Sequence, residues 1–234
     1  MKISIRILGI LGIVAVASSC KKDNYATPSL TLTGHIVYKG EAIQLERNQV
    51  PFQIYQYGFG QVGPIGQSFA QDGSYSALLY NGNYKIIVPN GQGPFIWKQT
   101  AANNPDTVNV ALKGNTTVDL EVTPYYMIRT PQMAAAGGKV TATFKAEKII
   151  TDANAKDIER VSLYINRVQF VSGGDNIAKT DLAGAGIVDP NNISLNVTIP
   201  TNITPVQNYV YARIGLKIAG VEDLIYSPLQ KISF

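Results

Sequence analysis

The chain of 234 residues contains one cysteine, one histidine and one tryptophan, and only 15% of its residues are charged. A single histidine, His35, excludes zinc sites built from several histidines and leaves little basis for a Ser-His-Asp triad. A single cysteine, Cys20, excludes an internal disulfide. The lysines and arginines form no cluster, so the sequence lacks the concentrated basic patch of a nucleic-acid-binding protein. We therefore expect no nucleic-acid partner.

Acidic residues are equally sparse and scattered along the chain. Glycoside hydrolysis needs two carboxylates that face each other across a sugar. Asp119 and Glu121 lie two apart on one predicted strand face, where surface carboxylates are common. The sequence has no Asp-x-Asp-x-Asp-Gly calcium loop and no phosphate-binding glycine loop. We predict that the protein is not an enzyme and uses no metal and no cofactor.

The N-terminus has the organisation of a secretory signal peptide. Two positive charges, Lys2 and Arg6, precede an apolar run at residues 7–17, which is too short to cross the roughly 30 Å of a bilayer as a helix. Small residues then lead to Cys20, as in a bacterial lipobox, although Ala17 occupies the position where leucine is most frequent. The alternative is an ordinary signal peptide with an incidental cysteine.

The lipobox interpretation predicts a signal peptide at residues 1–19 and a lipidated Cys20 as the first residue of the mature chain. Residues 20–29 are polar, contain Pro28 and show no periodicity, so we expect a lipidated tether. One acyl chain gives only marginal membrane binding. The two or three chains of a bacterial lipoprotein would make the membrane a permanent partner.

The remaining chain is rich in residues of strands and turns, with 13 tyrosines, 21 glycines and 12 prolines. In the first part, residues 30–38 alternate between polar and apolar side chains, and Asp72-Gly73 and Asn81-Gly82 are signals for tight turns. We expect strands at 74–79 and 84–88 to pair as a hairpin across Asn81-Gly82. Residues 106–112 and 116–122 are predicted to form a second such pair.

Alternation returns in the second part, at residues 140–147, 161–165, 193–199 and 209–218. In the last of these segments the apolar face carries Val210, Ala212 and Ile214, and Arg213 belongs to the opposite, polar face. Short strands with frequent turns predict an all-β protein of two tandem β-sandwich domains, at residues 30–123 and 124–234.

Three motifs resemble the transthyretin-like or carboxypeptidase-regulatory-like sandwich: Thr33-Gly34-His35-Ile36-Val37, Asp72-Gly73-Ser74-Tyr75 and Asn81-Gly82-Asn83-Tyr84. The segment from Tyr209 to Pro228, with its Ser227-Pro228 turn, is similar to the last two strands of an immunoglobulin-like or fibronectin-type-III sandwich. We therefore expect the first domain to be transthyretin-like and the second to be Ig-like.

Taken in chain order, the lipobox, the tether, the first sandwich, the junction and the second sandwich resemble the two-domain Bacteroidetes lipoproteins of unknown function. Those proteins are often encoded beside starch-utilisation-system-like transporter pairs. The most specific parts are residues 81–84 and the Thr123-Pro124-Tyr125-Tyr126 junction. The resemblance implies a lipid-anchored protein of the outer membrane, on the cell surface or the periplasmic face. It also implies an accessory role in glycan uptake beside outer-membrane transporter proteins.

Aromatic side chains are the candidate ligand-binding residues, because flat rings stack on the apolar C–H faces of sugars. Trp97 and Phe95 follow a glycine-rich loop, and Tyr55 and Tyr57 share a strand face. The alternatives are that Trp97 and Phe95 fill the first core and that the two tyrosines belong to a cross-strand ladder. We expect a non-catalytic glycan-binding protein; the alternative is a structural or adhesive, fimbria-like protein that acts through protein–protein contacts.

Overall fold

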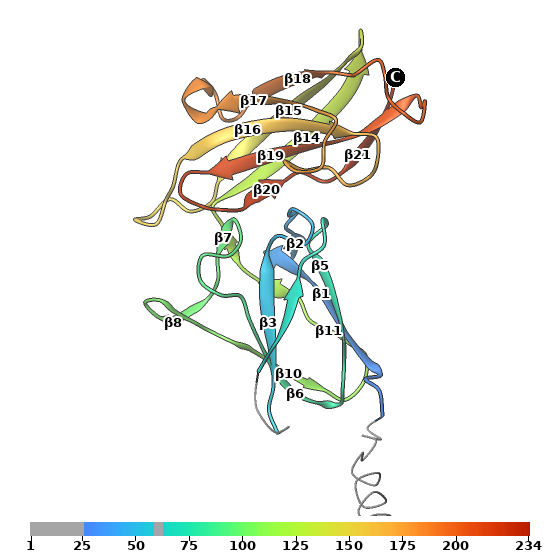
Figure 1. The fold of residues 1–234 in the computed structure, drawn as a ribbon. Helices are drawn as coiled ribbons and strands as arrows, with labels where there is room; N and C mark the ends of the chain where they lie inside the picture. Colours follow the sequence, from blue (N-terminus) through green and yellow to red (C-terminus); the bar gives the residue numbers. More distant parts are fainter. Residues whose placement is uncertain (1–25, 59–62) are drawn as a thin grey trace, which may run out of the picture.

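The computed structural model describes residues 26–58 and 63–234, which form two β-sheet domains, the second lying across one end of the first (Figure 1). The predicted all-β class with two domains is confirmed. The predicted signal peptide and Cys20 lie outside the described residues. Within the described part, no helix is long and apolar enough to cross a membrane.

Outside residues 59–62, the described part of the first domain holds thirteen strands, of which several are only two residues long. They are β1 (Leu30–Tyr38), β2 (Glu41–Ala42), β3 (Pro51–Gln56), β4 (Pro64–Ser68), β5 (Ser74–Leu79), β6 (Gly82–Ile87), β7 (Phe95–Ile96), β8 (Gln99–Ala101), β9 (Asn104–Pro105), β10 (Val108–Leu112), β11 (Thr116–Thr117), β12 (Leu120–Glu121) and β13 (Thr123–Pro124).

Two sheets enclose the core of this domain. In one sheet β1 is central: it pairs antiparallel with β2 and β5, and parallel with β11 and β12. The other sheet has the order β10-β6-β3-β4. Phe52 of β3 stacks on Phe69 with ring centroids 4.6 Å apart, and Tyr75 of β5 meets Phe52 edge-on. The two sheets are thus joined through aromatic packing.

The predicted pairing of β5 with β6 is wrong. β5 pairs with β1, whereas β6 lies between β3 and β10 in the opposite sheet. Neither Asn81 nor Gly82 has the positive φ that a type I′ hairpin turn requires. Each strand buries one face, and the two faces cover each other across the core, which side-by-side pairing would not allow. The predicted pairing of residues 106–112 with 116–122 fails in the same way, because β10 pairs with β6 and β11 with β1.

The motif residues of the first domain meet in space. A Cβ on Gly34 would lie 1.9 Å from the carbonyl oxygen of Val118. The Tyr75 hydroxyl donates to the same oxygen at 2.6 Å. Gly73, at φ +79°, allows the turn in which Asp72 accepts the Ser74 N–H at 3.0 Å. Only glycine at position 34 therefore lets β1 approach the backbone of Val118 and the side chain of Tyr75 so closely.

The second domain contains eight strands and one short 3₁₀ turn. These are β14 (Tyr126–Ala136), β15 (Lys139–Lys148), β16 (Ile158–Asn166), β17 (Ala178–Ala183), η1 (Gly184–Gly186), β18 (Ile193–Thr198), β19 (Tyr209–Ile218), β20 (Leu224–Tyr226) and β21 (Gln230–Ser233). A three-stranded sheet of order β14-β15-β18 packs on a sheet of order β17-β16-β19-β20, in which β19 also pairs with β21.

Sequence analysis missed the longest strand, β14. Its alternation is weak, and Pro131 interrupts it at a register shift against β15. The available signal was Gly137-Gly138, where both residues have positive φ and turn β14 into β15.

The two domains meet around Arg213 of β19, whose side chain is fully buried. Its Nε donates to the carbonyl of Ser227 at 3.0 Å, and its Nη1 donates to those of Leu45 at 3.1 Å and Val171 at 3.3 Å. Nη2 donates to the carbonyl of Gln71 at 3.1 Å. One guanidinium thus binds carbonyls of both domains. Arg213 lies on the strand face opposite Val210, Ala212 and Ile214, and that face is buried here because the first domain and the loop before β17 cover it.

Other contacts surround this arginine. The Tyr226 ring lies 4.4 Å from the guanidinium carbon, and its hydroxyl donates to Glu46 at 3.0 Å. The Gln71 amide donates to the carbonyl of Gln169 at 2.9 Å and accepts the Val171 N–H at 3.0 Å. The interface therefore consists of directional hydrogen bonds, which fix one relative orientation of the domains.

We predict that Arg213→Met lowers the free energy of unfolding by about 3 kcal/mol or more, because four buried carbonyls lose a charged donor while the volume is kept. Urea unfolding measures this loss. Arg160→Met is the matched control, since Arg160 pairs with Glu159 at 3.0 Å on the surface, and it should cost at most about 1 kcal/mol. Equal effects of the two substitutions would contradict the role assigned to Arg213.

Candidate functional site

A cavity of about 650 Å³ opens between the two domains. The first domain supplies the connection from β6 to β10, which includes β7 and the β8–β9 hairpin that projects sideways in Figure 1. The second domain supplies Asn154, Lys156 and the turn at 220–222. Tyr125, at the junction of the domains, completes the wall. The cavity thus exists only while the two domains are docked.

A hydrogen bond between the domains holds the loop beside the cavity. Gly91 and Gly93 have φ values of +82° and +79°, so the loop takes a path that glycine alone adopts readily. The Gly93 N–H donates to Asp223 Oδ2 at 2.8 Å. Burial raises the pKa of the Asp223 carboxyl, although this N–H works in the opposite direction. One wall is therefore tied directly to the turn that forms the other.

Amide side chains are the most frequent polar groups on the cavity wall: Asn90, Gln92, Gln99, Asn103 and Asn154. The Asn90 amide donates to the carbonyl of Asn103 at 3.0 Å, and its oxygen accepts from Gln99 Nε2 at 3.0 Å. Asn103 has a φ of +58°, a conformation that asparagine tolerates better than most residues. Because each amide offers two N–H donors and an acceptor oxygen, this network retains capacity for a ligand.

Tyr125 and Lys156 form the part of the wall nearest the junction. Lys156 Nζ lies 5.5 Å from the Tyr125 ring centroid and donates to the carbonyl of Gly220 at 3.0 Å. The Tyr125 side chain is half-buried, and burial raises its pKa. The phenol therefore remains a neutral hydrogen-bond donor at physiological pH, beside one exposed carboxylate, Glu222.

The structure places the predicted residues Trp97 and Phe95 at this cavity, but as its buried backing. Trp97 is 4% exposed and Phe95 is 5% exposed. The indole N–H of Trp97 donates to the carbonyl of Asp106 at 2.7 Å, and the Phe95 ring lies directly under Gly93. Neither ring presents a free face on which a sugar could stack. The packing of Trp97 and Phe95 therefore agrees with the alternative that they fill the core of the first domain.

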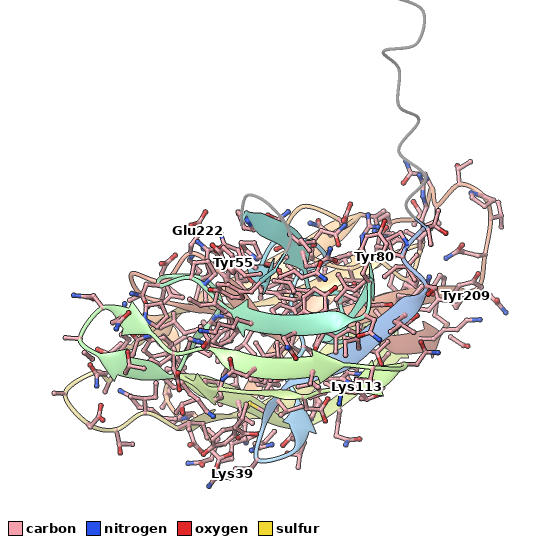
Figure 2. All side chains as sticks on the ribbon, turned by 90° about the horizontal axis from the view of Figure 1, so that it is seen from below. Lys39, Tyr55, Tyr80, Lys113, Tyr209 and Glu222 are labelled. Atoms are coloured by element: carbon pink, nitrogen blue, oxygen red, sulfur yellow. The ribbon has the colours of Figure 1, made fainter. Side chains whose placement is uncertain are left out.

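Tyr55 and Tyr57 lie elsewhere, on the outer face of the β10-β6-β3-β4 sheet. The Tyr55 hydroxyl donates to Gln53 at 2.9 Å. Tyr57 is 51% exposed, and Lys85 Nζ lies 5.2 Å from its ring centroid. Figure 2 shows Tyr55 and Glu222 on the same side of the molecule and Lys39 on the opposite side. The structure thus separates the four predicted aromatics into two pairs.

Sequence analysis missed the amides, Lys156 and the 220–222 turn, and it assigned Tyr125 only to the junction. A signal for the first-domain part was available, because Asn and Gln recur in the loops at 90–92 and 99–104. The second-domain part carries no local signal, since residues 154 and 220 are far apart in the chain and meet the first domain only after docking.

Asp119 and Glu121 serve the backbone. Asp119 accepts the N–H of His35 at 2.8 Å, and Glu121 accepts the N–H of Lys39 at 2.6 Å. Among the residues that the structure describes, no three His, Cys, Asp or Glu side chains gather closely enough to hold a metal ion.

Two family models match the chain in succession. The N-terminal domain of a protein of unknown function, DUF3823, matches residues 30–123, and the C-terminal domain DUF3823_C matches residues 126–231. A DUF3823 protein from Parabacteroides merdae is 34% identical with a TM-score of 0.77, covering 89% of this chain and 100% of its own. The chain belongs to the DUF3823 family.

Two further solved structures share the fold, a second DUF3823 protein and a protein described by its possible ligand. One from Bacteroides ovatus is 30% identical with a TM-score of 0.77, and covers 88% of this chain and 99% of its own. A candidate carbohydrate-binding protein from Bacteroides uniformis is 20% identical with a TM-score of 0.67, covering 88% of this chain and 100% of its own. The search of curated proteins found no match. The predicted membership in a two-domain family of unknown function is confirmed.

In this DUF3823 protein we predict that Asp223→Asn is at least as stable as the wild type at pH 7. The raised pKa means that the folded state binds the Asp223 proton more tightly than the unfolded chain does. The free energy of unfolding therefore falls as the pH rises from about 4 through the folded-state pKa. Asparagine keeps an acceptor for the Gly93 N–H and carries no charge.

Urea unfolding between pH 3 and pH 7 tests this prediction. The stability difference between Asp223→Asn and the wild type should grow with pH. Glu222→Gln controls for the removal of one negative charge from the same turn. A difference that stays constant with pH, or a variant that is less stable at pH 7, would contradict the prediction.

Proposed function

We propose that this protein binds carbohydrate, without transforming it, in the cavity between its two domains. The observation that carries the proposal is the composition of the wall: amide side chains on Asn90, Gln99, Asn103 and Asn154 line the same cavity as the half-buried Tyr125.

Sugar chemistry fits such a wall. Every hydroxyl of a sugar both donates and accepts a hydrogen bond, and an amide side chain does the same with its NH₂ and its oxygen. The C–H faces of a sugar are apolar and pack on an aromatic ring. A volume of about 650 Å³ also lies within the roughly 300–1,000 Å³ of small-ligand sites.

Catalysis has little support in this cavity. Glu222 is the carboxylate among the described lining residues, and its neighbour Asp223 is engaged by the Gly93 N–H. Two adjacent residues of one turn cannot stand on opposite sides of a glycosidic bond, as a hydrolase requires. A candidate carbohydrate-binding protein shares this fold, which is consistent with the proposal. At 20% identity the likeness extends to the fold alone.

We predict that calorimetry against starch, xylan, mannan, β-glucan, arabinan and pectin detects binding to at least one polysaccharide. Tyr125→Ala should weaken that binding about tenfold or more, which corresponds to about 1.4 kcal/mol. Asn103→Gly should also weaken it, because it removes an amide at a position whose positive φ glycine accepts.

Tyr209→Ala is the matched control, since Tyr209 is half-buried and lies at the other end of the molecule from Glu222 (Figure 2). It should leave the affinity unchanged. Binding to none of the six polysaccharides, with co-purification of a protein partner, would favour the structural or adhesive function instead. Turnover of a polysaccharide would contradict the absence of catalysis.

We also propose that the protein is lipid-anchored through Cys20 in the outer membrane, where it assists a glycan-uptake system. In Figure 1, β1 starts at the end of the first domain that faces away from the second domain. An anchor before β1 would therefore leave the interdomain cavity well away from the lipid surface and accessible to large glycans.

Cys20→Ser should move the protein from the membrane fraction to the soluble fraction, because two or three acyl chains account for stable membrane attachment. Fractionation and incorporation of labelled palmitate measure the effect. Ser19→Ala, next to the cysteine, is the control and should remain membrane-bound. A Cys20→Ser protein that stays in the membrane fraction would disprove the anchor.

A further inference from the structure

A second hollow, of about 350 Å³, lies on the outer face of the β10-β6-β3-β4 sheet. Tyr57, Asn83, Lys85 and Asn109 supply its exposed or half-exposed side chains. Lys85 and Asn109 are register partners on β6 and β10, so they point outward side by side. The hollow repeats the chemistry of the cavity: an aromatic ring, amides and one ammonium group.

The two hollows lie along the same pair of strands. After β6 the chain runs directly into Pro89 and Asn90, which line the cavity. Just before β10, the carbonyl of Asp106 accepts the indole N–H of Trp97 in the cavity wall. From Lys85 to Pro89 an extended chain covers about 13 Å. Tyr55, the neighbour of Lys85 on β3, lies on the same side of the molecule as Glu222 at the cavity (Figure 2).

We propose that this hollow extends the carbohydrate site, so that the ligand is a linear oligosaccharide with one end in the cavity and its following units along β6 and β10 to Tyr57. This inference rests on the proposed carbohydrate binding in the cavity. The distance of about 13 Å from Lys85 in the hollow to Pro89 at the cavity is longer than one sugar ring and within reach of a short linear oligosaccharide. A compact ligand cannot occupy both hollows.

Each side chain of the second hollow has a role in this arrangement. The exposed face of Tyr57 packs on the apolar face of a sugar unit. Lys85 Nζ, 5.2 Å from the Tyr57 ring centroid, is placed to donate to hydroxyls of the same unit. Asn83 and Asn109 offer donors and acceptors on either side of Lys85. The specificity of the site then depends on the linkage geometry of the chain as well as on the sugar in the cavity.

The test is calorimetry with malto-, cello-, xylo- and manno-oligosaccharides of two to six units. In the series that binds, the hexasaccharide should bind at least tenfold more tightly than the disaccharide. Tyr57→Ala should remove this gain and leave the disaccharide affinity unchanged. Tyr125→Ala should weaken both lengths alike, because both use the cavity.

Tyr38→Ala is the matched control, because Lys39 Nζ also lies 5.2 Å from the Tyr38 ring centroid, on the opposite sheet. It should alter neither affinity. Equal affinities for the two lengths, or a length gain that survives Tyr57→Ala, would overturn the extended site and leave binding in the cavity intact. Failure of all four series, when none of the six polysaccharides binds either, would overturn binding in the cavity and the extended site together; binding of a polysaccharide without binding of any of these linear series would overturn the extended site alone.

Discussion

A buried guanidinium group determines how the two domains of this protein are joined. Arg213 donates to four backbone carbonyls that come from both domains, and the described structure shows no salt bridge to it. Burial lowers its pKa to about 10, so it remains charged at neutral pH. Carbonyls bound to a planar, charged donor have little freedom to move. Arg213 is therefore the one side chain that binds the loops around Leu45, Gln71 and Val171 together, and the Gln71 hydrogen bonds to Gln169 and Val171 support the same placement.

The interdomain cavity depends on the same constraint. Among the described residues, no strand pairing joins the first-domain wall of the cavity to its second-domain wall. The hydrogen bond from Gly93 to Asp223 alone would not hold two domains in register. Because Arg213 and its surrounding contacts already hold them, the cavity is preformed, and under the proposed function a ligand would spend no binding free energy on ordering the domains.

The sequence allowed prediction of the strands more reliably than of their partners. Alternation located β1, β5, β15 and β19, because one face of each strand is buried. It could not tell that β5 and β6 face each other across the core, since a hairpin and a crossover between sheets produce the same alternation. Arg213 shows the same limit. Its position on β19 shows only that it lies opposite Val210, Ala212 and Ile214, and the docking of the first domain makes that face an interface.

The candidate site was predictable only in part, for a related reason. The aromatics Trp97 and Phe95 lie in a loop that lines the interdomain cavity, but the exposure of a ring is decided by what packs on it, and here Gly93 and Asp106 occupy the available positions. Tyr125, Lys156 and the 220–222 turn become neighbours of that loop only through docking. Residues that are distant in sequence and belong to two domains leave no local pattern to read.

The same arrangement separates the stability of the fold from the choice of ligand. Most of the cavity's side chains lie on turns and loops, where substitutions usually alter stability little. Arg213 and Gly34, in contrast, are fixed by buried carbonyls and by a backbone contact that no other residue permits. A protein of this family can therefore exchange its wall residues and keep its domain geometry. The 34% identity to a solved relative shows that the two proteins share the architecture. A shared fold does not identify the ligand, which depends on the side chains of each protein's own cavity. In this chain the cavity wall carries five amide side chains beside Tyr125, while Tyr57 and Lys85 line the second hollow on the outer face of the β10-β6-β3-β4 sheet.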